Sequence, residues 1–326
     1  MNAVDHNNVV IFDNRGIPSI MCRFVRPKDT EEVPAVFKIG DKVADAIYIS
    51  KYPNIVIDGR AYSMPMADPT VNITFDEAVQ ACRCKGLGWH LMTAVEYEYL
   101  LNQSREKGTM PHGNTDWGKD YYHNEEQGKV SNLGRTYTGT GPVTWNHDHT
   151  PYGVSDPNGN VWEWLAGLRI KDGVIEFIPG NKAASPYCDL SKDSTEWQQA
   201  ETSKGPVRAN VECGEITITD AVAADDYEPN YDGVRIEELE VKLSEIPQVL
   251  KDLGIIPDKR AEEEGKTYVY FDATEGEYLP FRGSAFSNTS LSGPSALGLN
   301  NPRSNSYGNI GFRSAFYEVN GKLITE

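Results

Sequence analysis

Residues 159–164 of this chain read Gly159-Asn160-Val161-Trp162-Glu163-Trp164, and they carry more information about its fold than any other stretch. Asp156-Pro157-Asn158, directly before them, are residue types that form turns. Because successive side chains of a strand point to opposite faces, Val161 and Glu163 would share one face and the two tryptophans the other. Paired large aromatic rings can anchor a core that has little regular structure around it. We therefore expect a short strand in which Trp162, Glu163 and Trp164 have structural roles.

Two helices are predicted before this strand by capping-box sequences, in which a Thr is followed three residues later by a Glu. The first would begin at Thr74 and end at Gly86, and the second would begin at Thr93 and end at Gly108. Glycine is the residue that most often follows the last turn of a helix. The first helix also has an apolar stripe that includes Phe75, which indicates one buried face.

The rest of the chain gives shorter signals. We predict strands at 46–52 and 268–271, a hairpin at 168–178 with Asp172-Gly173 at its turn, and a helix at 234–253 interrupted at Pro247. Residues 110–160 are rich in Gly, Asn, Asp, His and Trp and have weak periodicity, which is typical of long ordered loops. No repeat of a solenoid period is present.

Composition excludes several classes of function. The chain has 326 residues, with 31 Lys and Arg against 48 Asp and Glu, and its net charge of −17 opposes binding to a phosphate backbone. Its 39% hydrophobic content argues against disorder, and it contains no apolar run of the length that spans a membrane. The N-terminal sequence lacks the basic and apolar segments of a signal peptide and has no lipid-attachment cysteine. We expect neither a nucleic-acid partner nor a membrane span.

The five cysteines are Cys22, Cys82, Cys84, Cys188 and Cys213. This set is sparse and odd in number, whereas a disulfide scaffold would have more cysteines in a shorter chain. We expect ordinary reduced thiols, with a metal or redox site as the alternative.

The segment from Arg282 to Arg313 differs in composition from the rest of the chain. Between those two residues the only charged residue is Arg303, and the remainder is mainly Ser, Asn and Gly with scattered Leu, Phe and Tyr. Small polar residues with occasional aromatics on a rigid frame are typical of antibody-like binding surfaces. The alternative is a polar loop that only closes the domain.

The motif at 159–164 closely resembles the GNVWEW signature of the formylglycine-generating-enzyme (sulfatase-modifying-factor) superfamily. Other stretches resemble further family motifs in the same order, over residues 46–185 and 268–317: Ile47 to Tyr52, Leu91 to Tyr99, Gly113-Asn114, Arg282-Gly283 and Gly311-Phe312-Arg313. The resemblance implies an α+β fold of the C-type-lectin-like kind, elaborated as in the formylglycine-generating enzymes.

The enzymatic branches of that superfamily depend on residues that this chain does not keep. The formylglycine-generating members hold copper with two cysteines in their C-terminal part, whereas the last cysteine here is Cys213. The iron-dependent sulfoxide synthases use a histidine cluster, and the nearest equivalent here is the loop pair His147 and His149, for which no third ligand is evident. We therefore expect no catalytic residues, no metal and no cofactor.

A non-enzymatic branch gives the better match. The segment 282–313 resembles the variable region of proteins diversified by diversity-generating retroelements, which include phage receptor-binding proteins. It departs from that pattern at Ser284, Phe286 and Pro294-Ser295. The resemblance assigns the scaffold to Arg282, Gly283, Phe286, Leu297, Leu299, Gly311, Phe312 and Arg313. It assigns ligand binding to Ala285, Ser287, Asn288, Leu291, Gly298, Asn300, Arg303, Asn305, Tyr307, Gly308 and Asn309, with Tyr307 as the best candidate for an anchor.

The predicted organisation is an N-terminal strand region or attachment arm at 1–45, followed by a C-type-lectin-like domain at 46–326. Within that domain we expect an acidic insertion with its own helix at about 189–267 and a variable ligand-binding region at about 282–313. The predicted function is non-catalytic binding of a protein or glycan on a target cell surface by a phage-encoded, virion-associated or surface-displayed protein, with phage structural proteins as possible partners. The alternatives are a metal-dependent oxidase or sulfoxide-synthase-like enzyme, or a structural phage module.

Overall fold

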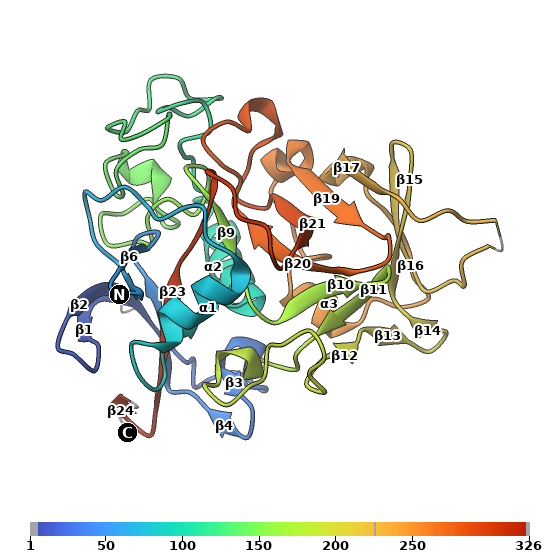
Figure 1. Ribbon diagram of the computed structural model, residues 1–326, viewed down its shortest axis with the longest axis horizontal. Coiled ribbons are helices and arrows are strands. Elements are labelled where there is room, and N and C mark those ends of the chain that lie inside the picture. The colour runs from blue at the N-terminus through green and yellow to red at the C-terminus, as the bar shows by residue number, and fades with distance from the viewer. Residues whose placement is uncertain (1–5, 225, 324–326) are drawn as a thin grey trace.

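The computed structural model describes residues 6–224 and 226–323. Its first sheet has the strand order β1-β2-β5-β23-β24, and β8 also pairs with β23. These strands are β1 (His6–Phe12), β2 (Pro18–Val25), β5 (Ala46–Ser50), β8 (His90–Leu91), β23 (Ser314–Val319) and β24 (Lys322–Leu323). The start and the end of the described chain therefore meet in one sheet, at the same side of the molecule (Figure 1).

The second sheet is larger and has the order β17-β19-β21-β20-β10-β11-β15-β16-β18, with β9, β12 and β22 off this path. Its strands are β9 (Trp162–Trp164), β10 (Leu168–Lys171), β11 (Val174–Phe177), β12 (Gln198–Gln199), β15 (Arg208–Glu212), β16 (Glu215–Thr219), β17 (Tyr231–Arg235), β18 (Glu240–Lys242), β19 (Tyr268–Asp272), β20 (Glu277–Arg282), β21 (Leu297–Pro302) and β22 (Ile310–Phe312). Three two-stranded ribbons complete the strands: β3 (Lys38–Ile39) with β4 (Lys42–Val43), β6 (Ile55–Ile57) with β7 (Arg60–Tyr62), and β13 (Glu201–Thr202) with β14 (Gly205–Pro206).

Both predicted capping boxes are confirmed. Thr74 and Glu77 cap α1 (Phe75–Arg83), and Thr93 and Glu96 cap α2 (Ala94–Lys107), which ends at Gly108 in the left-handed conformation. The other helices are short: α3 (Gln248–Asp252) and the 3-10 turns η1 (Ala35–Phe37), η2 (Val143–Trp145), η3 (Lys182–Ala184), η4 (Ile236–Glu238), η5 (Glu262–Lys266) and η6 (Thr289–Leu291).

The predicted helix over 234–253 is wrong. That stretch begins in β17, passes through η4 and β18, and forms a helix only at α3, where Pro247 is the N-cap. Val234 pairs with Val269 of β19, so its side chain enters the sheet core and not a helix face. The packing of this strand against its neighbour overrides the weak helical periodicity of the sequence.

Strand β9 joins the sequence motif to the C-terminal segment. It pairs antiparallel with β20, opposing Trp164 to Phe281, and parallel with β22, opposing Trp162 to Ile310. Both tryptophan rings contact the ring of Phe281 edge-on, with centroids 4.7 and 5.6 Å away. The alternation predicted from the motif is therefore observed, because the tryptophans share one face of the strand.

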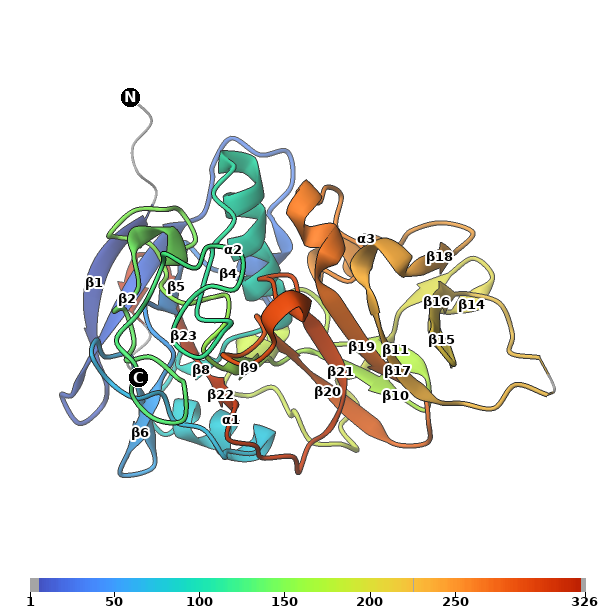
Figure 2. The same ribbon diagram turned by 90° about the horizontal axis from the view of Figure 1, so that it is seen from above.

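Residues 189–267 extend the second sheet. Strand β15 pairs with β11, β16 pairs with β15 and β18, and β17 pairs with β19, so these strands form the end of the molecule farthest from β1 (Figures 1 and 2). Buried Val211 and Ile216 belong to the same core cluster as Ile175 of β11. This stretch therefore shares the main core.

Candidate functional site

The C-terminal segment is held between the two sheets by its ends. At its start, Arg282 is buried and donates to Glu98 of α2 (3.0 Å), and its guanidinium lies 5.1 Å from the centre of the Tyr97 ring. At its end, Arg313 is buried and donates to both carboxylate oxygens of Glu163 (2.5 and 2.6 Å). Two charge-assisted contacts therefore fix the segment to α2 and to β9.

The predicted scaffold positions of this segment lie inside the protein, with Phe286 half-buried. Leu297 and Leu299 belong to the largest core cluster, and Phe312 packs in the cluster around Trp162 and Trp164. Gly311 lies so close to the carbonyl of Thr70 that a Cβ would be 2.8 Å from it. This explains why the position is a glycine.

Two predicted ligand positions are corrected by the structure. Ala285 has no exposed surface, and Gly298 is buried on β21 opposite Phe281. A Cβ at Gly298 would lie 2.5 Å from the Phe281 ring, so the position requires a glycine. Neither residue can contact a ligand in this conformation, and both are structural parts of the segment.

Ser287, Asn288 and Leu291 form a first group of partly exposed positions on and before η6. The long loop at 110–160 packs beside them: Trp117 donates its backbone N–H to the carbonyl of Phe286 (2.8 Å), and Tyr122 donates its hydroxyl to the carbonyl of Ser290 (3.1 Å). The side chains of Trp117 and Tyr122 are 54% and 50% exposed. Their aromatic surface therefore adjoins the predicted positions, although sequence analysis did not select them.

A second group lies between β21 and β22 and contains Asn305, Tyr307, Gly308 and Asn309. Tyr307 is 54% exposed, and the others are partly exposed. Backbone carbonyl groups make the contacts between this group and the rest of the protein. The carbonyls of Tyr307, Gly308 and Asn309 accept from Asn72 N–H (3.0 Å), Arg135 Nη1 (3.0 Å) and Trp162 N–H (2.8 Å). Side-chain replacements at 307–309 would leave these hydrogen bonds in place.

The loop at 110–160 connects the two groups. A Cβ on Gly134 would lie 2.5 Å from the Trp117 ring and 3.1 Å from the Phe286 ring, which places this glycine against the first group. Its neighbour Arg135 binds Gly308 in the second group and is itself held by Asp68 (3.0 Å).

Arg303 and Asn300 differ from the neighbouring predicted positions because their side chains contact other residues of the protein. The guanidinium of Arg303 is bound by Glu277 (3.0 Å) and Asp76 (2.6 Å) and lies over the Phe75 ring. These acidic partners raise the pKa of Arg303 despite its partial burial, which has the opposite effect. Asn300 is half-buried on β21 and accepts from the side chain of Asn301. Arg303, which directly follows β21, therefore joins this part of the segment to β20 and α1.

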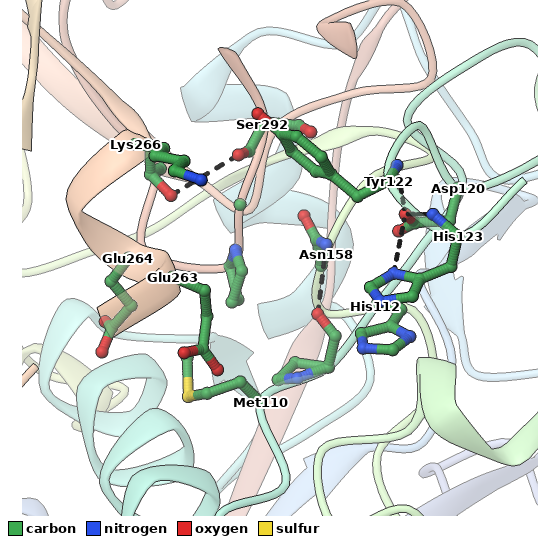
Figure 3. A pocket seen from close by; sticks show the side chains of 14 residues that line it. Met110, His112, Asp120, Tyr122, His123, Asn158, Glu263, Glu264, Lys266 and Ser292 are labelled. Atoms are coloured by element: carbon green, nitrogen blue, oxygen red, sulfur yellow. Dashed lines mark hydrogen bonds and ion pairs between the residues drawn. The ribbon is translucent and has the colours of Figure 1, made fainter. Parts of the chain in front are cut away.

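A cavity of about 280 Å³ opens beside the first group (Figure 3). One side carries His112, His123 and Tyr122 from the long loop, and the opposite side carries Glu263 and Lys266 of η5. Ser292, Gly293 and Pro294 of the C-terminal segment complete the wall. This cavity is not predictable from the sequence, because its walls come from three stretches that are far apart in the chain.

The two cavity histidines form a stacked pair, with ring centroids 3.7 Å apart and planes 7° from parallel. The Nδ1 of His112 contacts Glu126 (3.0 Å), and that of His123 contacts Asp120 (3.2 Å). Within residues 6–224 and 226–323, no group of three or more His, Cys, Asp or Glu side chains is placed to hold a metal ion.

The histidine pair considered from the sequence, His147 and His149, does not converge on one point. Nδ1 of His147, a buried residue, accepts from the N–H of Val154 (2.8 Å), whereas Nε2 of His149 contacts the carbonyl of Met110 (3.0 Å). Both imidazoles therefore make contacts with the backbone of the loop.

Three of the cysteines, Cys22, Cys82 and Cys188, are buried thiols with a raised pKa. Burial raises the pKa of Cys22 to about 12 and that of Cys188 to about 11, and it raises the pKa of Cys82 further. An elevated pKa keeps a thiol protonated and unreactive near neutral pH. Cys213 is exposed in the turn between β15 and β16, and the cavity lining contains no cysteine.

Comparison with known families gives one match, in the central part of the chain. Residues 51–208 match the family model of the sulfatase-modifying factor enzyme 1-like domain. This match confirms the predicted fold class, an α+β C-type-lectin-like fold of the formylglycine-generating-enzyme type. The matched range contains the motif at 159–164 and both capping boxes. A comparison with curated protein sequences gave no match.

Solved structures with a similar chain course include two variants of Major Tropism Determinant and one protein of Pseudomonas aeruginosa. The I1 and P3c variants are 12% and 13% identical, with TM-scores of 0.34 and 0.33, over 97% of this chain and 62% of theirs. PvdO from Pseudomonas aeruginosa is 14% identical, with a TM-score of 0.40, over 96% of this chain and 99% of its own. This chain thus spans less than two thirds of the Major Tropism Determinant variants. Among the described residues, no helix has the length and apolar character needed to cross a membrane.

Proposed function

We propose that this chain, whose residues 51–208 match the sulfatase-modifying factor enzyme 1-like family model, is a non-catalytic ligand-binding protein whose residues 282–313 are diversified by a retroelement. Its ligand is a protein or glycan on the surface of a target cell. The chain is phage-encoded and associated with the virion, where phage structural proteins are its further partners.

One observation carries this proposal: the segment separates side chains that hold the frame from side chains that face solvent. Arg282, Leu297 and Arg313 are buried, whereas Tyr307 is exposed and its backbone is held by hydrogen bonds that any residue could make. A protein with this separation tolerates changes of surface chemistry without a change of backbone. That tolerance is what a diversified binding region needs.

The proposed ligand surface keeps the partly exposed predicted positions and adds two aromatic residues. It consists of Ser287, Asn288, Leu291, Asn300, Asn305, Tyr307, Gly308 and Asn309, together with Trp117 and Tyr122, and Arg303 lies beside it with its guanidinium engaged by Glu277 and Asp76. Trp and Tyr supply large contact area at little cost in conformational entropy. We expect Tyr307, Trp117 and Tyr122 to provide most of the binding energy.

The enzymatic alternative has a simple test. The family model is named for an enzyme, but residues 214–326 contain no cysteine to serve as a C-terminal copper ligand. Elemental analysis of the purified protein should find less than stoichiometric copper and iron. A stoichiometric amount of either metal would support the enzymatic alternative, provided that chelation removes the metal and an oxidase activity together.

The binding proposal is tested by flow cytometry with fluorescently labelled protein on a panel of bacterial cells. Tyr307→Ala should lower binding to a recognised strain by about tenfold or more, because truncation of an aromatic hot spot costs about 2 kcal/mol. The matched control is Tyr187→Ala, which removes a tyrosine that is also exposed but lies outside the segment. Equal binding by both variants and the parent would contradict the proposed surface.

The diversification is tested in the neighbouring DNA. A reverse-transcriptase gene and a near-copy of the region that encodes 282–313, differing mainly at adenines, should lie close to this gene. A genomic neighbourhood with neither element would refute diversification and leave ligand binding as a separate question.

A further inference from the structure

The cavity beside η6 is a candidate anchor site within the proposed ligand surface. Tyr122 lines it, and one wall is formed by Ser292, Gly293 and Pro294, which belong to the segment 282–313. Its volume of about 280 Å³ is below the roughly 300–1,000 Å³ of sites for drug-sized ligands. It therefore has room for about one side chain.

The floor of the cavity favours an apolar group. Buried Met110, Pro111 and Pro294 line it. The buried polar side chains of the lining are already engaged. Asn158 Nδ2 donates to the carbonyl of Pro111 (3.1 Å), and its Oδ1 accepts from Ser284 Oγ (3.1 Å). Asp120 accepts from the N–H of Gly113 (2.9 Å) and Glu264 from Arg105 (2.8 Å), while the hydroxyls of Thr267 and Ser292 donate to the carbonyls of Ser292 (3.4 Å) and Thr289 (2.6 Å). A polar ligand group placed on this floor would lose water without gaining an equivalent partner, which is costly.

The rim has the opposite character. Glu263 and Lys266 are exposed on one side, and half-exposed His123 lies across from them, with its Nδ1 on Asp120 and its Nε2 without a hydrogen-bond partner among the described residues (Figure 3). A carboxylate, an ammonium group and an imidazole can together bind both the N–H and the C=O of a peptide group. The charges at the rim thus complement the main chain of a peptide, and the floor complements an apolar side chain.

We infer that this cavity receives one exposed apolar side chain of a protein ligand, with the adjoining peptide group bound at the rim by Glu263, Lys266 and His123. This inference rests on the proposed function and narrows its ligand from protein or glycan to protein. A glycan would present mainly hydroxyl groups to a lining whose buried polar side chains are already hydrogen-bonded within the protein. Burial of a side chain of leucine size gives an affinity on the order of 10 mM for the isolated group.

The test is NMR of protein labelled with ¹³C at its methionine methyl groups. N-acetyl-leucinamide should shift the Met110 signal in a saturable way, whereas buried Met21 and Met92, which do not line the cavity, should not respond. N-acetyl-asparaginamide has a similar size and a polar end, and it should bind at least about tenfold more weakly. Methyl glucoside should not shift Met110.

Two variants complete the experiment. His123→Trp fills the mouth of the cavity and should abolish the response of Met110 to N-acetyl-leucinamide, while unchanged Met21 and Met92 signals show that the protein is folded. Tyr121→Trp adds the same ring at an exposed neighbour that does not line the cavity and should preserve the response. The inference is overturned if N-acetyl-leucinamide leaves the Met110 methyl signal unchanged at tens of millimolar. It is also overturned if N-acetyl-asparaginamide or methyl glucoside binds as strongly as N-acetyl-leucinamide. Either result leaves the Tyr307→Ala prediction standing, so the two failures are distinguishable.

Discussion

Arg313 shows how one residue fixes the C-terminal segment. Besides its two contacts with Glu163, its guanidinium donates to the carbonyls of Ser50 (3.0 Å) and Ser155 (3.1 Å), so it joins β5, β9 and the loop before β9. The motif residue Glu163 is therefore the counter-ion of this arginine. A buried charge whose partner is removed is strongly destabilising, because the remaining charge stays out of water.

Arg313→Met should lower the free energy of unfolding by about 3–5 kcal/mol, since it leaves the Glu163 carboxylate buried without its partner. Urea denaturation followed by circular dichroism measures this change. The control is Lys242→Met, which breaks the exposed pair with Glu240 and should leave stability unchanged. An Arg313→Met protein as stable as the parent would show that the segment is fixed by other contacts.

Asp156, in the turn before the motif, predicts a pH dependence of stability. Burial raises its pKa from 3.8 to about 6, against the hydrogen bond from Gly139 N–H and the charge of Arg313, which both lower it. The folded state therefore binds a proton more tightly than the unfolded state. Ionisation of this carboxyl therefore lowers the free energy of unfolding gradually as the pH rises from about 4 to 6. The loss, on the order of 3 kcal/mol, remains at higher pH.

Asp156→Asn should remove this cost. An asparagine amide can accept the same N–H bond and also tolerates the left-handed backbone at this position (φ 58°). Urea denaturation should show a gain relative to the parent that is larger at pH 7.5 than at pH 4. Asp58→Asn is the control, since Asp58 has a similar φ of 49° but is exposed. A gain independent of pH would contradict the assignment of the cost to Asp156 ionisation.

At the scale of elements, the two capping boxes have the same sequence pattern in different surroundings. At α1 the box is exposed. At α2 it is buried, and its members make further contacts: Thr93 donates to Asn181 (2.6 Å), and Glu96 contacts His90 (2.9 Å) and Asn181 (3.0 Å). The second box thus joins α2 to β8 and to the loop before η3.

Thr93→Ala should therefore lower the free energy of unfolding by about 2 kcal/mol or more, because it leaves buried partners unsatisfied in addition to removing a cap. Thr74→Ala should cost about 1 kcal/mol or less. Thermal and urea unfolding of the two variants give the comparison. Equal losses would mean that the buried contacts of Thr93 add nothing to the cap.

Elements with a local signal were predictable from the sequence, and those that depend on distant partners were not. Both capping boxes, the Asp172-Gly173 hairpin turn with its two positive φ angles, and the alternation of the motif strand were predicted correctly. The prediction of a helix at 234–253 was wrong because the start of that stretch belongs to β17, which pairs with β19 in the second sheet. Ala285 and Gly298 were wrongly predicted to be exposed, because the exposure of a residue depends on what packs over it in the fold, as the ring of Phe281 does at Gly298. The cavity was missed for the same reason, since its walls meet only in the folded chain.

At the scale of the whole molecule, the second sheet carries the stretch 189–267 and the C-terminal segment together. Glu264 of η5, in that stretch, binds Arg105 of α2 (2.8 Å), and Arg105 also binds Glu98, the partner of Arg282. The stretch is thus tied through one charge network to the base of the proposed ligand surface. This continuity gives the exposed loops a rigid support.

The most direct measurement compares two libraries for resistance to proteolysis. One randomises exposed Tyr307 and the partly exposed positions Ser287, Leu291 and Asn309, and the other randomises the buried positions Leu297, Leu299, Gly311 and Phe312. Surface replacements usually change stability by less than about 0.5 kcal/mol, whereas loss of a buried Leu or Phe costs about 2–5 kcal/mol. We predict that most members of the first library resist proteolysis like the parent and that few members of the second do. Equal loss of resistance in both libraries would contradict the separation of ligand surface from frame.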